Sequence, residues 1–181
     1  MLFCVVAPVG AFADSGTGGA SYTPPPPPTI GPSTAPLGQP TPIVPGAKAV
    51  LLADGTAAAP ADAPANVQNA IWAANTLQKL PYRYGGGHKS FTDTAYDCSG
   101  SVSFALHGAG LLDYTMDSTM LESFGDAGPG RWITIYANAD HTFLTVAGVR
   151  FDTSGQSAAG TRWQPAARST KGFVVRHPTG L

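Results

Sequence analysis

Prolines are concentrated in the N-terminal part of the chain. Pro24 to Pro28 form an unbroken run, and further prolines stand at positions 32, 36, 40, 42 and 45. Because proline fixes φ and has no backbone N–H, such a tract favours an extended polyproline helix and cannot build a packed core. We therefore expect residues 14–46 to be a disordered linker and residues 47–181 to be one folded domain. Recognition of the tract by a proline-binding module is the alternative interpretation.

Residues 1–13 have the pattern of the end of a secretory signal peptide. An apolar run from Leu2 to Ala7 is followed by Ala11-Phe12-Ala13, which resembles a signal-peptidase site. The run is too short to span a bilayer, so we expect an exported protein without a membrane span. Cleavage would remove Cys4 and leave Cys98 alone. A single cysteine in an oxidising compartment cannot form an internal disulfide, so a nucleophilic role is the leading explanation.

Charge and glycine spacing argue against two classes of ligand. The chain has 12% charged residues and a formal net charge of −1, which does not indicate a nucleic-acid partner. Gly85, Gly86 and Gly87 are consecutive, but they lack the spacing and the following Lys-Ser/Thr of a phosphate-binding loop. We therefore do not expect a nucleotide site.

Apolar periodicity predicts helices before residue 110 and strands after residue 130. One helical stripe starts after a possible N-cap at Asp62 and ends before Pro81, and a second stripe follows Cys98 and closes at residues 108–110. The strand-like runs are residues 131–136, 141–147, 149–153 and 172–177. Residues 111–130 and 154–170 are expected to be irregular. Helices followed by strands indicate an α+β fold, with an antiparallel sheet packed on the Cys98 helix.

Cys98 is expected at the N-terminus of its helix. Free backbone N–H groups and the positive end of the helix dipole favour an anion there. A thiolate is such an anion, and cysteines in this position have lowered pKa values. The alternative is that Cys98 is a small buried hydrophobic residue.

A cysteine nucleophile needs a base and a group that orients the base. His141 opens one predicted strand, and Asp152 lies on the next strand after a turn at Gly148, so the two side chains can meet across a hairpin. The carboxylate would fix the imidazole tautomer and stabilise its protonated form. His107 is too far along the helix to serve Cys98, and His177 is expected to be structural. No cysteine and histidine spacing typical of zinc is present, so no metal is expected.

Four segments resemble the NlpC/P60 cysteine peptidases, which cut bacterial cell-wall peptides. Residues 81–86, Pro-Tyr-Arg-Tyr-Gly-Gly, resemble the family's Tyr-x-x-Gly-Gly segment, and residues 96–102, Tyr-Asp-Cys-Ser-Gly-Ser-Val, resemble its nucleophile motif. Residues 141–146 resemble the strand that opens with the catalytic histidine, and residues 151–153 fall where the family has its third polar residue. The resemblance covers residues 62 to 153.

The resemblance implies a papain-like NlpC/P60 fold and a role for each matching residue. It implies Cys98 as nucleophile, His141 as base and Asp152 as the orienting residue. Tyr82 would contribute its hydroxyl to the oxyanion site together with backbone N–H groups near Cys98. The third position is often His, Asn or Gln in the family, so Asp152 is a departure from its pattern.

Further polar residues are candidates for substrate contacts. They are Asp97 and Ser99 in the nucleophile motif and His88 in the segment between Gly86 and Asp97, which is longer than in simpler members of the family. Three arginines, Arg131, Arg162 and Arg168, are candidates for binding the carboxylates of wall peptides.

We therefore expect a secreted, monomeric endopeptidase of the cell wall or periplasm, acting on peptidoglycan stem peptides without a cofactor. The resemblance implies cleavage between D-γ-glutamyl and diaminopimelate or lysine through a Cys98 thioester. Two alternatives are an N-acetylmuramoyl-L-alanine amidase or acyltransferase on the same fold, and a non-catalytic wall-binding module. Alkylation of Cys98 well below pH 8 would distinguish an enzyme from a binding module.

Overall fold

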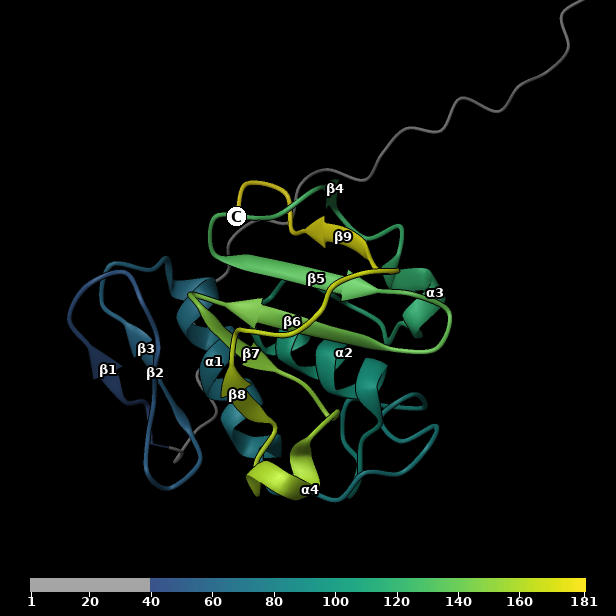
Figure 1. Ribbon diagram of the computed structural model, residues 1–181, viewed down its shortest axis with the longest axis horizontal. Helices are drawn as coiled ribbons and strands as arrows, with labels where there is room; N and C mark the ends of the chain where they lie inside the picture. Colours follow the sequence, from purple (N-terminus) through teal and green to yellow (C-terminus); the bar gives the residue numbers. More distant parts are fainter. Residues whose placement is uncertain (1–39) are drawn as a thin grey trace, which may run out of the picture.

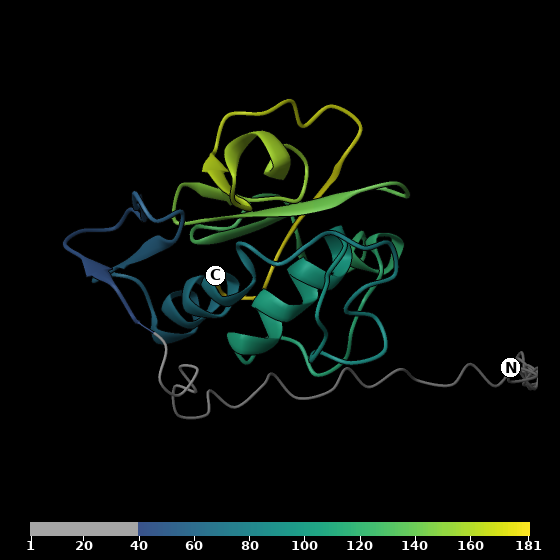
Figure 2. The ribbon, with the colours of Figure 1, turned by 90° about the horizontal axis from the view of Figure 1, so that it is seen from below.

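The computed structural model describes residues 40–181 and has an α+β architecture, as expected (Figure 1). A six-stranded antiparallel sheet has the order β4-β9-β5-β6-β7-β8. Its strands are β4 (Asp126–Ala127), β5 (Ile133–Ala137), β6 (Thr142–Val146), β7 (Val149–Phe151), β8 (Trp163–Pro165) and β9 (Val174–His177). The helices are α1 (Ala65–Leu77), α2 (Cys98–Gly108), α3 (Ser118–Leu121) and α4 (Gln156–Ala159). Figure 2 shows α1 and α2 on one face of the sheet and α4 on the other.

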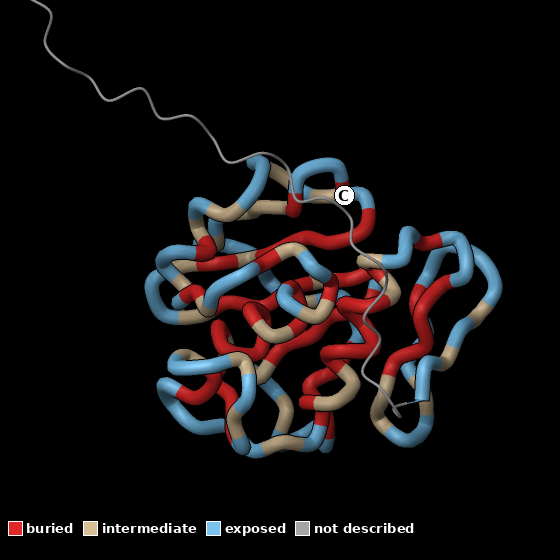
Figure 3. Tube along the Cα trace, turned by 180° about the vertical axis from the view of Figure 1, so that it is seen from behind, coloured by how far each residue is buried: buried red, intermediate tan, exposed pale blue. Residues whose placement is uncertain are grey.

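The two long helices pack on each other and on the sheet through the apolar stripes that the sequence predicts. Both stripes are buried, and Figure 3 shows buried chain running through these helices and the central strands. At the crossing, a Cβ on Gly108 would lie 2.3 Å from Cβ of Ala73, so the glycine permits the close approach. The expected N-cap of α1 is wrong: Pro64 occupies the N-cap position and makes no capping hydrogen bond through its side chain. Asp62 lies in a turn, where its N–H donates to Gly46 O at 3.1 Å.

The hairpin formed by β6 and β7 has the predicted turn. Ala147 and Gly148 both have positive φ, +48° and +91°, which is the pattern of a two-residue type I′ turn. Val146 then pairs with Val149, and Leu144 pairs with Phe151. Because the hairpin register follows from the turn, it brings the start of β6 close to the residues after β7.

A small sheet of order β1-β3-β2 was not predicted. Its strands are β1 (Ile43–Val44), β2 (Val50–Leu51) and β3 (Ala57–Pro60). The side chain of Asn75 on α1 holds β3 by accepting from Ala57 N and donating to Ala57 O, both at 2.9 Å. Since β1 pairs with β3, ordered structure begins before the expected domain boundary at residue 47. The expected signal peptide and most of the expected linker lie outside the described residues.

Regular elements also occur in segments that were expected to be irregular. Residues 111–130 contain α3 and β4, and residues 154–170 contain α4 and β8. None of the helices between residues 40 and 181 has the length and apolar composition needed to cross a lipid bilayer.

Candidate active site

Cys98 is the first residue of α2, as the sequence predicts. Asp97 caps the helix by accepting a hydrogen bond from Gly100 N at 2.8 Å. Cys98 is a free, half-buried thiol. Its sulfur therefore lies where the unpaired N–H groups of a helix start favour negative charge.

The geometry brings the Cys98 and His141 side chains into hydrogen-bonding contact. Burial acts to raise the pKa of Cys98, but hydrogen bonds from His141 and from Thr142 N–H, with the positive charge of His141, lower this pKa below its ordinary value. Burial acts to lower the pKa of His141, but hydrogen bonds with Asp152 and Cys98 and their negative charges raise it to about 9. Both shifts favour a thiolate beside an imidazolium, which is the reactive form of a nucleophilic cysteine.

The carboxylate of Asp152 contacts His141. Its Oδ1 atom lies 2.9 Å from His141 Nε2, which leaves Nδ1 as the ring nitrogen that faces Cys98. Ser154 N also donates to Oδ1, at 2.8 Å. Burial acts to raise the pKa of Asp152, but the hydrogen bonds from His141 and Ser154 N, and the positive charges of His141 and Arg168, lower it. The carboxylate is ionised and holds the imidazole in one tautomer.

Tyr82 lies near Cys98, on the loop that follows α1. Burial, and then the negative charges of Cys98 and Asp97, raise the pKa of its hydroxyl. The hydroxyl therefore stays protonated and can donate a hydrogen bond. Tyr82 is 53% exposed, which leaves its hydroxyl accessible to a substrate.

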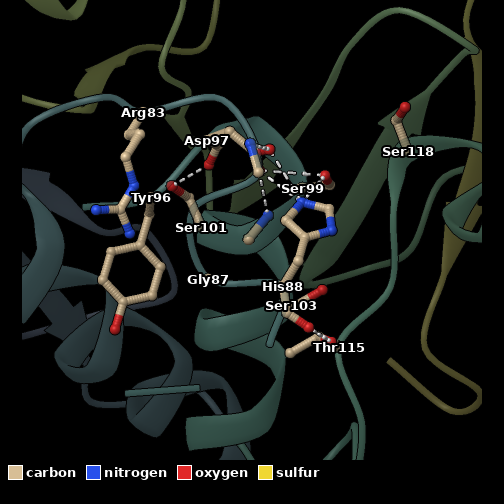
Figure 4. A network of polar contacts seen from close by, with 12 residues as sticks. Arg83, Gly87, His88, Tyr96, Asp97, Ser99, Ser101, Ser103, Thr115 and Ser118 are labelled. Carbon is tan, nitrogen blue, oxygen red and sulfur yellow. Dashed lines mark hydrogen bonds and ion pairs between the residues drawn. The ribbon is translucent and has the colours of Figure 1, made fainter. Parts of the chain in front are cut away.

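The residues expected to contact substrate form a network around Asp97 (Figure 4). His88 Nε2 lies 3.0 Å from Asp97 Oδ1 and 3.1 Å from Ser99 Oγ. Gly85 N donates to Asp97 Oδ2 at 2.9 Å. Asp97 is buried, and these contacts engage both its oxygens, so it joins the glycine-rich loop to α2. Direct contact of His88, Asp97 and Ser99 with a substrate stays a prediction.

The three candidate arginines have different surroundings. Arg162 is fully buried and donates to backbone carbonyls, so it is no longer a candidate for binding a substrate carboxylate. Arg131 is exposed, with its guanidinium carbon 5.3 Å from the centre of the Trp132 ring. Arg168 forms an ion pair with Asp152.

Two contributions to the site were missed from the sequence. Arg150 donates to Asp152 Oδ2 at 2.5 Å, and Thr142 N–H donates to Cys98. The first had a signal: residues 150 and 152 are two apart in the predicted strand 149–153, so their side chains were expected to share a face. The second is a backbone contact, which residue types do not encode. Among the described residues, no group of three or more His, Cys, Asp or Glu side chains is placed to hold a metal ion.

Comparisons with known proteins gave structural neighbours only. No family model matches the sequence, and no match was found among curated proteins. The fold is similar to the peptidoglycan hydrolase RipB from Mycobacterium tuberculosis, with 26% identity and a TM-score of 0.47 over 61% of this chain and 64% of that chain. It is also similar to the P60 domain of antigen MAP1204 from M. avium subspecies paratuberculosis, with 21% identity and a TM-score of 0.45 over 61% of this chain and 93% of that domain.

The first neighbour is named a peptidoglycan hydrolase and the second a P60 domain. Because both TM-scores lie below 0.5, these likenesses decide neither the fold nor the activity of this chain. The match also spans less than two thirds of RipB. The function proposed next rests on the residues of the chain itself.

Proposed function

We propose that this protein is an exported cysteine endopeptidase that hydrolyses peptidoglycan stem peptides and has the NlpC/P60 fold. The observation that carries the proposal is the contact of Cys98 with His141, together with the 2.9 Å contact between His141 Nε2 and Asp152 Oδ1. A binding module has no need of a thiolate beside an imidazolium. The motif resemblance supports the substrate class and the bond between D-γ-glutamyl and diaminopimelate or lysine.

The first half of the reaction forms a thioester. The Cys98 thiolate attacks the amide carbonyl, and the carbonyl oxygen becomes an oxyanion. The Tyr82 hydroxyl and backbone N–H groups at the start of α2 would stabilise this oxyanion. As the tetrahedral intermediate collapses, the C–N bond breaks and the protonated His141 gives its proton to the leaving amine.

The second half releases the acid. His141 is now neutral and takes a proton from a water molecule, which attacks the thioester carbonyl. Collapse of the second oxyanion breaks the C–S bond and regenerates the thiolate beside the imidazolium. Asp152 keeps His141 in one orientation through both halves.

Mass spectrometry of purified stem peptides tests the proposal. Incubation with the protein should give fragments with a new free amine on diaminopimelate or lysine. The Cys98→Ala and His141→Gln variants should lose at least about 10³-fold in rate. His107→Gln is the matched control, because His107 is an exposed histidine of α2 that binds Leu112 O.

Other outcomes would change the assignment. Fragments cut at the muramoyl–alanine bond would keep the nucleophile and make the protein an amidase. Tight binding of stem peptides without any cleavage would make it a non-catalytic wall-binding module and contradict the proposal.

A further inference from the structure

The carboxylate of Asp152 is held on both of its oxygens. Asp152 is buried, and its Oδ1 accepts from His141 Nε2 and Ser154 N. Its Oδ2 accepts from Nη1 of Arg150 at 2.5 Å and from Nη1 of Arg168. Two guanidinium groups therefore meet one carboxylate oxygen, on the side away from His141.

The two arginines are fixed independently. Arg150, on β7, is buried and also donates from Nη2 to Gln164 Oε1 at 2.8 Å. Arg168 belongs to the segment between β8 and β9, which arches over the sheet in Figure 2. Its guanidinium carbon lies 4.6 Å from the centre of the Phe143 ring and 5.6 Å from that of Phe173. Aromatic faces on which a guanidinium rests restrict its position.

Arg168 adds a positive charge beyond the one that Arg150 supplies to neutralise Asp152. A thiolate, an imidazolium, a carboxylate and one guanidinium sum to zero charge, and Arg168 makes the cluster positive. Among residues 40–181, Asp97 and Tyr82 are the charged or titratable groups of other elements that interact with Cys98, and the negative charge of Asp97 acts to raise the pKa of the thiol. A net positive charge on the far side of Asp152 offsets Asp97 and leaves Oδ1 directed at His141.

We propose that Arg168 is a positioning residue of the reaction: paired with Arg150, it fixes Asp152 on His141 and so maintains the imidazolium that stabilises the Cys98 thiolate. The segment between β8 and β9 is thereby part of the active site, although it lies far from Cys98 in the sequence. The inference rests on the proposed function only in treating the Cys98–His141 pair as catalytic.

Alkylation of Cys98 by iodoacetamide tests the inference without any wall substrate. The rate is followed against pH on the peptide that contains Cys98, so that Cys4 does not interfere. Arg168→Gln should move the acid limb of the profile upward by about 0.5–1 pH unit, because the thiolate loses part of its stabilisation. Arg168→Lys keeps the positive charge and should move the acid limb of the profile by less. Lys171→Gln removes a positive charge from the same segment and should leave the profile unchanged.

A second background distinguishes positioning from a direct charge effect. In a His141→Gln variant, Arg168→Gln should shift the profile by less than about 0.2 unit, because its effect passes through Asp152 and His141. An equal shift in both backgrounds would overturn the inference, as would an Arg168→Gln profile identical to that of the unsubstituted protein. Where stem peptides are cleaved, kcat should fall with KM unchanged. A protein that shows the alkylation shift but cuts no wall peptide would contradict the proposed function and leave this inference standing.

Discussion

Replacing Arg162 with methionine should destabilise the domain more than any surface substitution. Arg162 is fully buried, and burial lowers its pKa to about 10, so it is still charged at neutral pH. Nη1 donates to Leu77 O and, at 2.7 Å, to Leu80 O. Nη2 donates to Pro81 O at 3.3 Å and to Tyr96 O at 3.1 Å. The side chain thus joins the end of α1 to the residues that precede Tyr82 and Asp97.

The expected cost follows from these contacts. Each of the four hydrogen bonds from the guanidinium contributes about 1 kcal/mol, so their loss costs about 4 kcal/mol. Leu77 O, Leu80 O and Pro81 O each keep a second donor, which is Leu80 N, Gln156 Nε2 and Tyr96 N respectively. The Nε–H of Arg162 has no partner within residues 40–181, and its removal returns about 1 kcal/mol. Methionine fills most of the space with an apolar side chain. We therefore expect a loss of about 3 kcal/mol in the free energy of unfolding.

Urea unfolding followed by tryptophan fluorescence measures this loss. The m-value should stay the same while the midpoint falls. Arg131→Met is the matched control, because Arg131 is exposed, and it should change the free energy of unfolding by no more than about 0.5 kcal/mol. If Arg162→Met costs less than about 1 kcal/mol, the four hydrogen bonds of the guanidinium do not stabilise the domain and the reasoning is wrong.

Two further predictions concern the pH dependence and the glycine-rich loop. Because the pKa of His141 is raised from 6.5 to about 9, kcat/KM should fall as pH rises through about 9. The contribution of His141 to the free energy of unfolding should be complete below pH 6.5 and lost towards pH 9. A fall in kcat/KM centred near pH 6.5 would contradict this prediction. A Cβ on Gly100 would lie 2.1 Å from Gly86 O, so Gly100→Ala should push the glycine-rich loop away from α2. The thermal unfolding midpoint and the activity should both fall. Gly110→Asn is the control, because a Cβ on Gly110 would have nothing within 4 Å. Equal losses in the two variants would show that the contact with Gly86 is not responsible.

The parts of the fold that were predictable carry strong local signals. The stripe after Cys98 gave α2 with the correct start and end, and the glycine at position 148 gave the turn of the β6–β7 hairpin. The small sheet carries no such signal, because β3 consists of Ala57–Pro60 and alanine has little preference for strands. Its order comes instead from Asn75 and from burial against α1, which are tertiary contacts.

The candidate site was predictable where side chains are close in sequence or joined by one hairpin. Cys98, His141 and Asp152 met this condition. Arg168 did not, because its contact with Asp152 depends on how the segment between β8 and β9 returns over the sheet. Arg162 looked like a surface cation by residue type, yet the carbonyls around it provide the partners that burial of a charge requires.

The network around Asp97 has a consequence for reading mutational scans of this protein. Asp97 and Cys98 are adjacent, and a scan scored only by activity would find both intolerant of substitution. The causes differ: in the proposed function Cys98 supplies the reacting atom, whereas Asp97 supplies the cap of α2 and the attachment of the glycine-rich loop. A loss of activity at a position in this motif can therefore come from a lost reacting group or from a destabilised fold. A parallel measurement of the abundance of folded protein distinguishes the two causes at each position.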